Sequence, residues 1–364
     1  MTWLDERVAG NPVQGGDFAP ALADMAWTAS VGRSHFTHRA GVVFRDTQSL
    51  REGLLALRAA DEGPVVEATA RIAFAFADDL GRWAGMGETL HRSEPVARAV
   101  LERCEAAFRE FEGASLLDAM FGRAGSDAVL HDPTWTQPAV YALECALAAL
   151  WSGVGVQPGV VLGQGPGEIA AAQAAGMLGL EDGLRLAMAR GRLLGALPQV
   201  GAQAGAFVDL QETLAGVAIS PAAATFIGGT TGRASQPGNA LENNYWQGQA
   251  VEPFNLGVSV AALAELKVDA VVEIGPEATL GPAVRDAWPR AAVRGAPAIV
   301  SSLRRPAAEA TADDAGFAPA AAQAFEAGIP LRFEGLFAGE ARRRVSLPGY
   351  PFQRRRFWID TAPR

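Results

Sequence analysis

The stretch VVLGQGPGEIAAA, Val160–Ala172, decides the fold of this 364-residue chain. An apolar run that is typical of a buried strand leads into the turn Gly163–Gly167, in which every second residue is glycine. Glycine tolerates the backbone conformations of a tight turn, and proline, here Pro166, is favoured at the first position of a helix. The stretch therefore predicts a strand, a sharp turn and a helix, which is the repeating unit of an α/β sheet.

The same alternation of strands and helices extends on both sides of this stretch. The candidate strands are Ile72–Ala77, Gly159–Leu162, Ala224–Ile227, Ala270–Ile274 and Ala298–Ser301. The helical patterns between them are Pro95–Glu112, Trp135–Ser152, Pro166–Ala175, Leu180–Leu197 and Val258–Leu266. Strands that are apolar throughout and alternate with helices indicate a parallel sheet that is covered on both faces.

Three zones of different composition divide the chain. Residues 1–66 predict a small α+β domain, and residues 67–301 hold the α/β pattern. The elements expected in the first zone are a helix, a strand and a helix at Phe18–Ser30, Arg39–Phe44 and Thr47–Ala59. Residues 302–364 begin with alanine-rich sequence and continue as PLRFEGLFAGEARRRVSLPGYPFQRRRFWID, which has little periodicity. We expect this last zone to be an extended strap over the surface of the rest.

Composition excludes several classes of protein. Hydrophobic residues make up 49% of the chain and charged residues 20%, which is the balance of a globular protein and not of a disordered one. The net charge of −9 argues against a nucleic-acid partner, because such proteins are usually basic. The two cysteines, Cys104 and Cys145, form neither a disulfide framework nor a four-ligand zinc site, and both fit core positions. We therefore expect a cytoplasmic protein without a metal or another cofactor.

No segment predicts a membrane span. The N-terminal residues MTWLDERVAG have no apolar signal core. The most apolar stretch, Ala139–Leu162, contains Glu144 and several glycines and is a poor span. Near the C-terminus, ARRRVSLPGYPFQRRRFW interleaves arginines with aromatic residues, as nucleic-acid or membrane surfaces do. The family resemblance described below explains that segment better, as a strap whose arginines keep their charges in water.

The turn Gly163–Gly167 has the G-x-S-x-G layout of a nucleophile elbow, in which a serine is lifted above the sheet between a strand and a helix. Gly165 occupies the serine position and has no side chain that attacks a carbonyl carbon. The residue after the nucleophile donates its backbone N–H to the oxyanion, but that residue is Pro166, which has no N–H. Two groups that act on the same chemical step are therefore missing.

Glycine-rich turns before helices also bind phosphates, which is a second interpretation of this loop. The G-x-G-x-x-G pattern does not match, however, and a Walker lysine is absent. Glu168 in the first helical turn repels a phosphate. A plain structural turn is a third interpretation, and it is compatible with a degenerate elbow.

Seven segments resemble, in the same order, the acyltransferase region of modular type I polyketide synthases, including the ketosynthase-to-acyltransferase linker and the linker after the acyltransferase. They are DMAWTASVGRSHFTHRAGVV (Asp24–Val43), WAGMGETL (Trp83–Leu90), TQPAVYALECALAALW (Thr136–Trp151), GQGPGEIAAAQAAGMLGLEDGLRLAMARGRLL (Gly163–Leu194), YWQGQAVEPF (Tyr245–Phe254), VVEIGPEATL (Val271–Leu280) and LPGYPFQRRRFWID (Leu347–Asp360). The resemblance implies a large subdomain like that of malonyl-CoA:acyl carrier protein transacylases, which is related in layout to the α/β-hydrolases.

The resemblance also implies a chemistry from which this chain departs. In the family the elbow reads G-H-S-x-G-E, the serine accepts an acyl group from a coenzyme A thioester, and a glutamine of a G-Q-G-x-Q motif helps to form the oxyanion hole. Gln164 stands at the histidine and Gly165 at the serine. Asp79 stands at the oxyanion glutamine, where a carboxylate repels a developing oxyanion. The arginine that binds the carboxylate of malonyl or methylmalonyl is retained as Arg190.

The catalytic base of the family, a histidine, lies on a smaller ferredoxin-like subdomain inserted into the large one. Such a βαββαβ unit needs roughly 65–70 residues, from typical lengths of strands, helices and connections. Fewer than about thirty residues are available near 198–224, and no histidine follows His131. We therefore expect the subdomain and its base to be missing, as an internal deletion in an otherwise preserved fold.

Two retained residues leave alternatives open. Arg190 either still binds a carboxylate or is a relict that is now paired with an acid or solvated. Gln137 is expected to satisfy backbone groups beneath the elbow, or to be a relict of substrate binding. The histidines are interpreted as structural or surface residues: His35, His38, His91 and His131.

Together these departures predict a catalytically inactive pseudo-acyltransferase with an architectural role in a polyketide synthase module. Its expected partners are the ketosynthase and acyl carrier protein domains of the same synthase, with an acyltransferase acting in trans as a further candidate. One alternative is an enzyme with a residual or altered acyl transfer, hydrolysis or decarboxylation. The other is a non-catalytic module that binds an acyl group or an acyl carrier protein.

Overall fold

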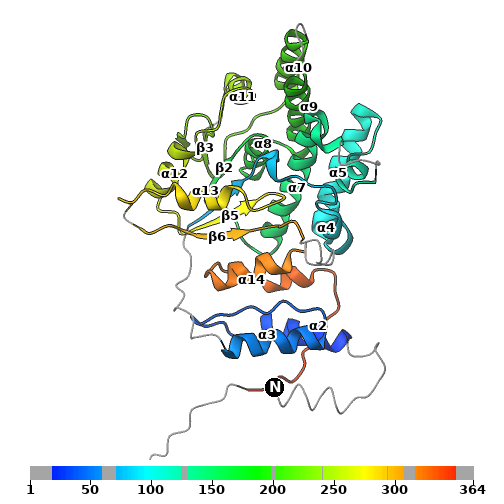
Figure 1. The fold of residues 1–364 in the computed structure, drawn as a ribbon, viewed down its shortest axis with the longest axis vertical. Coiled ribbons are helices and arrows are strands. Elements are labelled where there is room, and N and C mark those ends of the chain that lie inside the picture. Colours follow the sequence, from blue (N-terminus) through cyan, green and yellow to red (C-terminus); the bar gives the residue numbers. More distant parts are fainter. Residues whose placement is uncertain are drawn as a thin grey trace, which may run out of the picture.

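A computed structural model describes residues 19–59, 71–123, 129–197, 202–239, 241–292, 294–306 and 316–349 (Figure 1). A six-stranded sheet forms its centre, in the order β4-β3-β2-β1-β5-β6. The strands are β1 (Ile72–Phe76), β2 (Val160–Gly163), β3 (Thr225–Ile227), β4 (Ala234–Ser235), β5 (Ala270–Ile274) and β6 (Ala298–Ser301). All five strands predicted for residues 67–301 are confirmed to within one residue at each end.

The sheet is not parallel throughout, and the prediction needs correction on this point. β1, β2, β3, β5 and β6 pair in parallel, as expected. β4 pairs antiparallel with β3, with Phe226 opposite Ser235 and Ile227 opposite Ala234. A strand of two residues is too short to produce an alternating pattern, so no sequence pattern predicts it.

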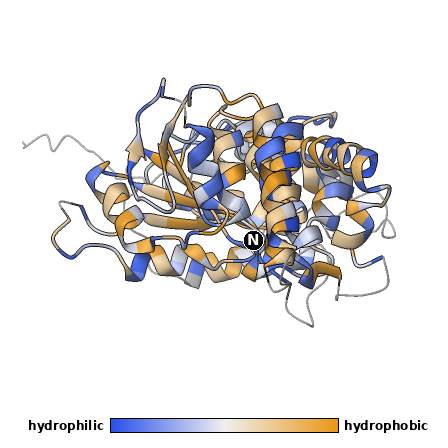
Figure 2. Ribbon diagram, turned by 90° about the horizontal axis from the view of Figure 1, so that it is seen from above, coloured by the Kyte–Doolittle hydropathy of each residue, from blue (hydrophilic) through white to orange (hydrophobic). Residues whose placement is uncertain are grey.

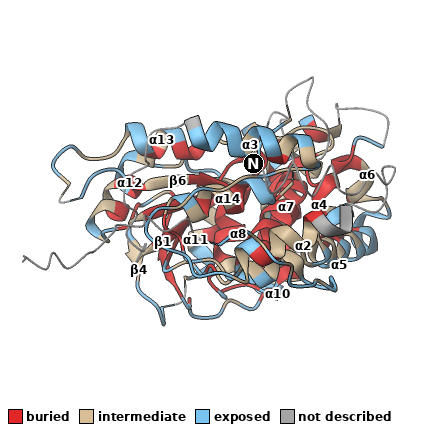
Figure 3. Ribbon diagram, turned by 90° about the horizontal axis from the view of Figure 1, so that it is seen from below, coloured by how far each residue is buried: buried red, intermediate tan, exposed pale blue. Residues whose placement is uncertain are grey.

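Both faces of the sheet are covered, because alternate residues of each strand enter two different hydrophobic clusters. Phe74 and Phe76 of β1 belong to the cluster on the side of α5 (Pro95–Glu112), α7 (Pro133–Gly153), α8 (Pro166–Ala174) and α9 (Leu180–Ala196). Ala73 and Ala75 belong to the cluster on the side of α12 (Leu256–Glu265) and α13 (Leu280–Asp286). The strands are hydrophobic along their length, and Figures 2 and 3 show them enclosed between the helices.

Helix α7 crosses the centre of the first cluster and is buried along most of its length. It begins at Pro133 because Asp132 caps it, accepting a hydrogen bond from the N–H of Thr134. Its neighbour α9 approaches closely through glycines. A Cβ atom at Gly191 would lie 2.5 Å from the backbone oxygen of Pro133. This close packing fixes α9, and with it Arg190, against the core.

The remaining helices of the α/β unit are short except for α10, which has 14 residues. They are α4 (Glu88–Ser93), α6 (Leu116–Met120), α10 (Gln203–Gly216), α11 (Asn243–Gln249) and the 3₁₀ helices at Asp79–Gly81 (η1) and Val129–His131 (η2). Among the described residues between α9 and β3, 202–224, α10 is the one helix or strand. Leu210 and Leu214 bury its inner face, and Arg192 Nε of α9 donates to Asp209 Oδ2 at 2.8 Å. The expectation of at most one helix in this interval is met within the described residues.

The N-terminal domain contains α2 (Ala19–Ser30) and α3 (Thr47–Ala59), as predicted. The strand predicted at Arg39–Phe44 is wrong, since the backbone there forms no strand with any described residue. Instead, the segment packs against α14 (Ala318–Glu326), with the N–H of Gly41 donating to Glu326 Oε1 at 2.8 Å. The predicted boundary at residues 66 and 67 lies outside the described residues.

The last zone includes α14, the 3₁₀ helix η4 (Phe333–Phe337) and an extended segment that runs back along α2 (Figure 1). The N–H groups of Arg343 and Val345 donate to Asp24 Oδ1 and Thr28 Oγ1, both at 3.0 Å. This part of the strap therefore joins the α/β unit to the N-terminal helices, as the sequence predicted. The segment of the strap beyond residue 349 lies outside the described residues.

Two further expectations concern membranes and metals. In the part of the chain that the structure describes, every helix is too short or too polar to cross a membrane. The same part contains no group of three or more His, Cys, Asp or Glu side chains placed to hold a metal ion.

Candidate functional site

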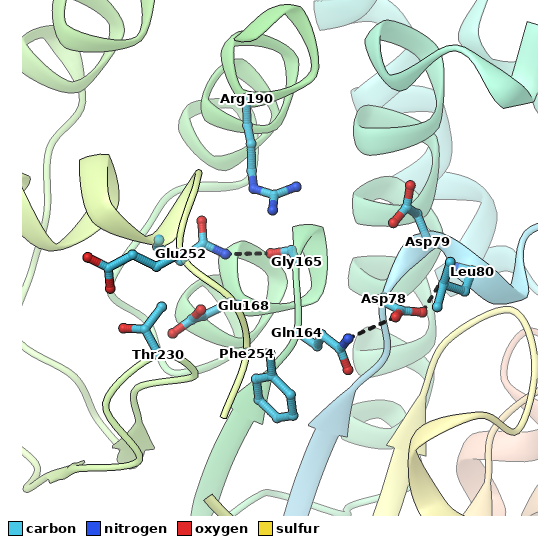
Figure 4. A pocket seen from close by; sticks show the side chains of 11 residues that line it. Asp78, Asp79, Leu80, Gln164, Gly165, Glu168, Arg190, Thr230, Glu252 and Phe254 are labelled. Carbon is cyan, nitrogen blue, oxygen red and sulfur yellow. Dashed lines mark hydrogen bonds between the residues drawn. The ribbon is translucent and has the colours of Figure 1, made fainter. Parts of the chain in front are cut away.

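A cavity of about 220 Å³ opens at the carboxyl ends of β1 and β2 (Figure 4). This is the edge of a parallel sheet at which α/β proteins usually bind ligands. The lining residues come from the end of β1, the β2–α8 turn, α8, α9, and the loop and helix after β3. They are Asp78, Asp79, Leu80, Gln164, Gly165, Glu168, Arg190, Thr230, Gln249, Glu252 and Phe254.

The turn between β2 and α8 keeps the backbone of a nucleophile elbow. Gly165 has φ +59° and ψ −125°, a conformation that is strained for any residue with a side chain. The turn is also tightly packed. A Cβ atom at Gly163 would lie 2.2 Å from the carbonyl oxygen of Gly167, and one at Gly167 would lie 2.3 Å from that of Ala77. The sharp strand-to-helix turn predicted from the sequence is therefore present, with glycine at its apex.

The space in front of Gly165 is open to the cavity. A Cβ atom built on Gly165 would lie 3.8 Å from Asp78 Cβ and 3.9 Å from both Nη atoms of Arg190, which are ordinary contact distances. The carbonyl oxygen of Gly165 accepts a hydrogen bond from Gln249 Nε2 at 2.8 Å. The apex of the turn is thus held by Gln249, which also lines the cavity.

Asp78 and Asp79 follow β1 and form one wall of the cavity. Asp78 Oδ1 accepts the N–H of Leu80, and Asp78 Oδ2 accepts Gln164 Nε2–H, both at 2.9 Å. Burial raises the pKa of Asp78. Asp79 is half-buried, and its carboxylate accepts no hydrogen bond from the described residues. The position assigned to the oxyanion glutamine therefore carries an acceptor and not a donor.

Arg190 reaches the cavity from α9 and points toward Gly165 (Figure 4). Its side chain is buried, with 9% exposure, and Nη1 donates to Gln137 Oε1 of α7. Arg190 Nε has no hydrogen-bond partner, and no carboxylate oxygen of a described residue lies within 4.0 Å of the guanidinium. Burial lowers the pKa of Arg190, and the charges of Asp79 and Glu168 oppose this shift. The alternative of an arginine paired with an acid does not describe this geometry among the described residues.

Gln137 lies in α7 behind the cavity and not in its lining. Its Oε1 accepts the hydrogen bond from Arg190, and its Nε2 has no partner. The expectation that Gln137 satisfies backbone groups beneath the elbow is therefore wrong. It orients Arg190 instead.

The opposite wall contains a carboxyl group, that of Glu168, which the sequence analysis did not predict to join parts of the site. Glu168 of α8 is 2% exposed and accepts hydrogen bonds from the N–H of Gly229, at 2.7 Å, and from the hydroxyl of Tyr245. Burial raises the pKa of Glu168 to about 7, although both hydrogen bonds favour the charged form. Glu168 thereby ties the elbow helix to the loop after β3 and to α11.

The histidines and cysteines lie away from the cavity. The imidazole of His35 contacts the rings of Phe325 and Phe333, and His38 is exposed. His91 Nε2 lies 3.4 Å from Glu102 Oε1, and His131 Nδ1 lies 3.1 Å from Arg82 Nη2. Both thiols are buried in the core, and burial raises the pKa of Cys104 to about 12. The described part of the cavity therefore holds neither a thiol nor an imidazole.

Two sequence-family models match parts of the chain. Residues 81–213 match the acyl transferase domain family, and residues 19–54 match the family described as CurL-like, PKS C-terminal. A spectinabilin polyketide synthase system protein, NorA' of Streptomyces orinoci, is 32% identical over 433 residues, which cover 98% of this chain. Erythronolide synthase EryA2 of Saccharopolyspora erythraea is 27% identical, over 94% of this chain. This chain spans 12% of the length of each of these relatives.

Solved structures support the fold. The acyl transferase domain of ZmaA superposes with a TM-score of 0.80 at 20% identity, covering 95% of this chain and 94% of that domain. The acyltransferase domain from the second module of the salinomycin polyketide synthase gives 0.72 at 22% identity, over 94% and 98% of the two chains. MCAT from Streptococcus pneumoniae gives 0.55 at 19% identity and covers 65% of this chain and 97% of its own.

Proposed function

We propose that this chain, which has the sequence and fold of an acyltransferase domain of modular type I polyketide synthases with its ketosynthase-to-acyltransferase linker region, is a catalytically inactive form of that domain. The observation that carries the proposal is the elbow itself. Gly165 adopts the strained conformation of a nucleophile turn but offers no nucleophile to the cavity. The proposed role is architectural.

The first half of an acyl transfer needs a nucleophile whose oxygen attacks the thioester carbon, and donors that stabilise the resulting oxyanion. Gly165 lacks the oxygen. Pro166, the next residue, has no N–H to donate. Asp79 brings a carboxylate to the wall where the oxyanion would form, so the electrostatic contribution there is repulsive. Three separate features therefore oppose the same step, and they support the proposed inactivity.

The base and its subdomain are the second part of the proposal. No histidine follows His131 in the sequence, and the described histidines lie away from the cavity. The alignment to NorA' extends over 433 residues and covers 98% of this chain, about 357 residues, so at least about 76 aligned positions have no residue here. That number is sufficient for the roughly 65–70 residues of a ferredoxin-like subdomain. The short interval between α9 and β3, with α10 as its described element, supports this deletion.

The proposed architectural role follows from what is preserved. The strap along α2 and the helix α14 join the α/β unit to the N-terminal helices through specific hydrogen bonds. Such a connection holds neighbouring domains in a fixed geometry without any reaction in the cavity. We propose that the partners are the ketosynthase and acyl carrier protein domains of the same synthase. The acyl units would then come from another acyltransferase, including one acting in trans.

A second candidate function is non-catalytic binding of an acyl group, and one observation favours it. Arg190 is buried at the cavity without a described carboxylate partner, so its guanidinium is free to bind an anionic group. The third candidate is an enzyme with altered acyl chemistry.

One experiment separates these candidates. The protein is incubated with malonyl-CoA, methylmalonyl-CoA and acetyl-CoA, with and without acyl carrier protein, and both intact mass and coenzyme A release are measured. We expect no adduct and no release above the rate in buffer, while an active acyltransferase domain in parallel gives both. An acyl adduct or turnover would overturn the proposal. Saturable binding without turnover, lost in Arg190→Ala, would favour the binding module.

A further inference from the structure

Arg190 and Asp79 face the same cavity with opposite charges and do not form an ion pair. The only described hydrogen bond of Arg190 runs to Gln137, and its Nε has no partner. The carboxylate of Asp79 accepts no hydrogen bond from the described residues. Figure 4 shows the two side chains on different walls, with the space in front of Gly165 beside them. A buried guanidinium with unused donors points to a ligand that supplies an acceptor.

The other carboxyl groups of the cavity are engaged or turned away. Asp78 accepts hydrogen bonds from Leu80 and Gln164. Glu168 accepts them from Gly229 and Tyr245. Glu252 is exposed, and its carboxylate points away from Gly165 in Figure 4. Asp79 is therefore the carboxylate that remains available to a ligand near Arg190.

We propose that the cavity binds a small zwitterion with the chemistry of a free amino acid, its carboxylate on Arg190 and its ammonium group on Asp79. The inference goes beyond the proposed architectural role and requires no reaction at Gly165. A carboxylate matches the planar donors of a guanidinium, and an ammonium group supplies the donors that an acceptor-only carboxylate requires.

The size and charge of the cavity support this class of ligand over a larger anion. A volume of about 220 Å³ lies below the ~300–1,000 Å³ of sites for drug-sized ligands, so the cavity suits a small molecule. A ligand with negative charges only would leave Asp78 and Asp79 without a cationic partner, because Arg190 is the one cation among the described residues that line the cavity.

The test compares four probes of similar size by calorimetric titration of the full chain at pH 7.5. Alanine and β-alanine carry both charges at two different spacings, propionate carries the carboxylate alone, and ethylammonium carries the cation alone. We expect at least one zwitterion to bind at least about tenfold more tightly than either single-charge probe. Propionate binding as well as the zwitterions would overturn the inference, and so would the absence of saturable binding by both zwitterions at millimolar concentration.

Three variants test which residue binds each charged group of the ligand. Asp79→Asn should weaken binding of the zwitterion about tenfold and leave propionate binding equal or tighter, because the repelling carboxylate is gone. Arg190→Gln should abolish binding of both. Glu110→Gln, on the exposed side of α5 and outside the lining, is the control for the loss of one negative charge and should change neither. An unchanged zwitterion affinity in Asp79→Asn overturns the inference, and circular dichroism of each variant confirms folding. Because no thioester is present, this outcome is independent of the acyl-transfer assay.

Discussion

The Nε2 amide of Gln164 donates a hydrogen bond to Asp78 Oδ2 at 2.9 Å, and this bond joins the turn after β2 to the end of β1. The second oxygen of Asp78 is occupied by the N–H of Leu80. The position at which relatives are expected to carry the histidine of the elbow therefore has a structural partner in this chain. The wall of the cavity is fixed by a hydrogen bond between a neutral donor and a carboxylate.

Gln164→Glu tests this relationship. The variant replaces the donor by a second carboxylate at nearly the same position, so two like charges face each other in a partly buried wall. Their repulsion raises both pKa values above those of the unfolded chain, and stability is then lost as pH rises. We expect a loss of about 1–3 kcal/mol at pH 8, measured by urea unfolding, and a smaller loss at pH 5.

The double variant Gln164→Glu/Asp78→Asn is the control, because it restores one amide and one carboxylate in reversed positions. It should recover most of the stability at pH 8. Equal losses of unfolding free energy at both pH values in the single variant would show that the hydrogen bond between Gln164 and Asp78 does not hold the wall.

Gly165→Ser tests whether a hydroxyl at the apex of the turn is sufficient for acyl transfer. The Cβ atom fits, but φ +59° with ψ −125° costs a serine about 1–3 kcal/mol. We expect this loss in urea unfolding and no acyl adduct by intact mass after incubation with malonyl-CoA, because Pro166 and Asp79 remain. Gly165→Ala carries the same backbone cost without the hydroxyl and serves as the control. An adduct in Gly165→Ser, absent in Gly165→Ala, would show that the other losses matter less than we infer.

Glu168→Gln tests the buried carboxyl behind the elbow. Because the pKa of Glu168 is raised to about 7 in the folded chain, the folded state retains a proton that the unfolded state releases near its ordinary value of 4.5. The contribution of Glu168 to stability is therefore fully present below about pH 4.5 and is lost as pH rises to about 7, by about 3 kcal/mol. The glutamine variant should lack this part of the pH dependence.

The measurement is the difference between wild type and variant in urea unfolding across pH 5 to 8. Using the difference matters because burial also raises the pKa of Asp78, Glu94, Glu144 and Glu273, which act in the same direction. Glu110→Gln on the exposed side of α5 controls for the loss of one charge. Parallel pH curves for wild type and Glu168→Gln would contradict the assignment.

The sequence determined much of the fold because the decisive signals are local. Apolar strands and amphipathic helices located β1, β2, β3, β5 and β6 within one residue, and the glycine turn located the elbow. Pairing depends on distant residues, and here the predictions failed. The two-residue β4 has no pattern of its own, and the segment Arg39–Phe44 looks like a strand but packs against α14 instead.

The candidate site was predicted in part because some of its residues occupy positions of local motifs. These residues are Gln164, Gly165, Asp79 and Arg190, and the structure brings all four into one cavity. The contacts of Glu168 with Tyr245 and of Gln249 with Gly165 join residues about eighty positions apart. Tyr245 and Gln249 belong to α11 and lie in the segment YWQGQAVEPF. The resemblance of this segment to the family was the one sequence signal for them, and a resemblance does not say which residues they contact.

The packing of α9 on α7 gives a prediction about stability with a control one turn away. A Cβ atom at Gly191 would lie 2.5 Å from the backbone oxygen of Pro133, which belongs to the first turn of α7 and cannot move without displacing that helix. Gly191→Ala should therefore destabilise the chain by about 1–3 kcal/mol. At Gly195 the nearest atom is Thr134 Cγ2 at 3.6 Å, so Gly195→Ala should stabilise it by up to about 1 kcal/mol through helix propensity. Thermal and urea unfolding measure both variants, and similar effects of the two would mean that α9 does not rest on the backbone of α7 at Gly191.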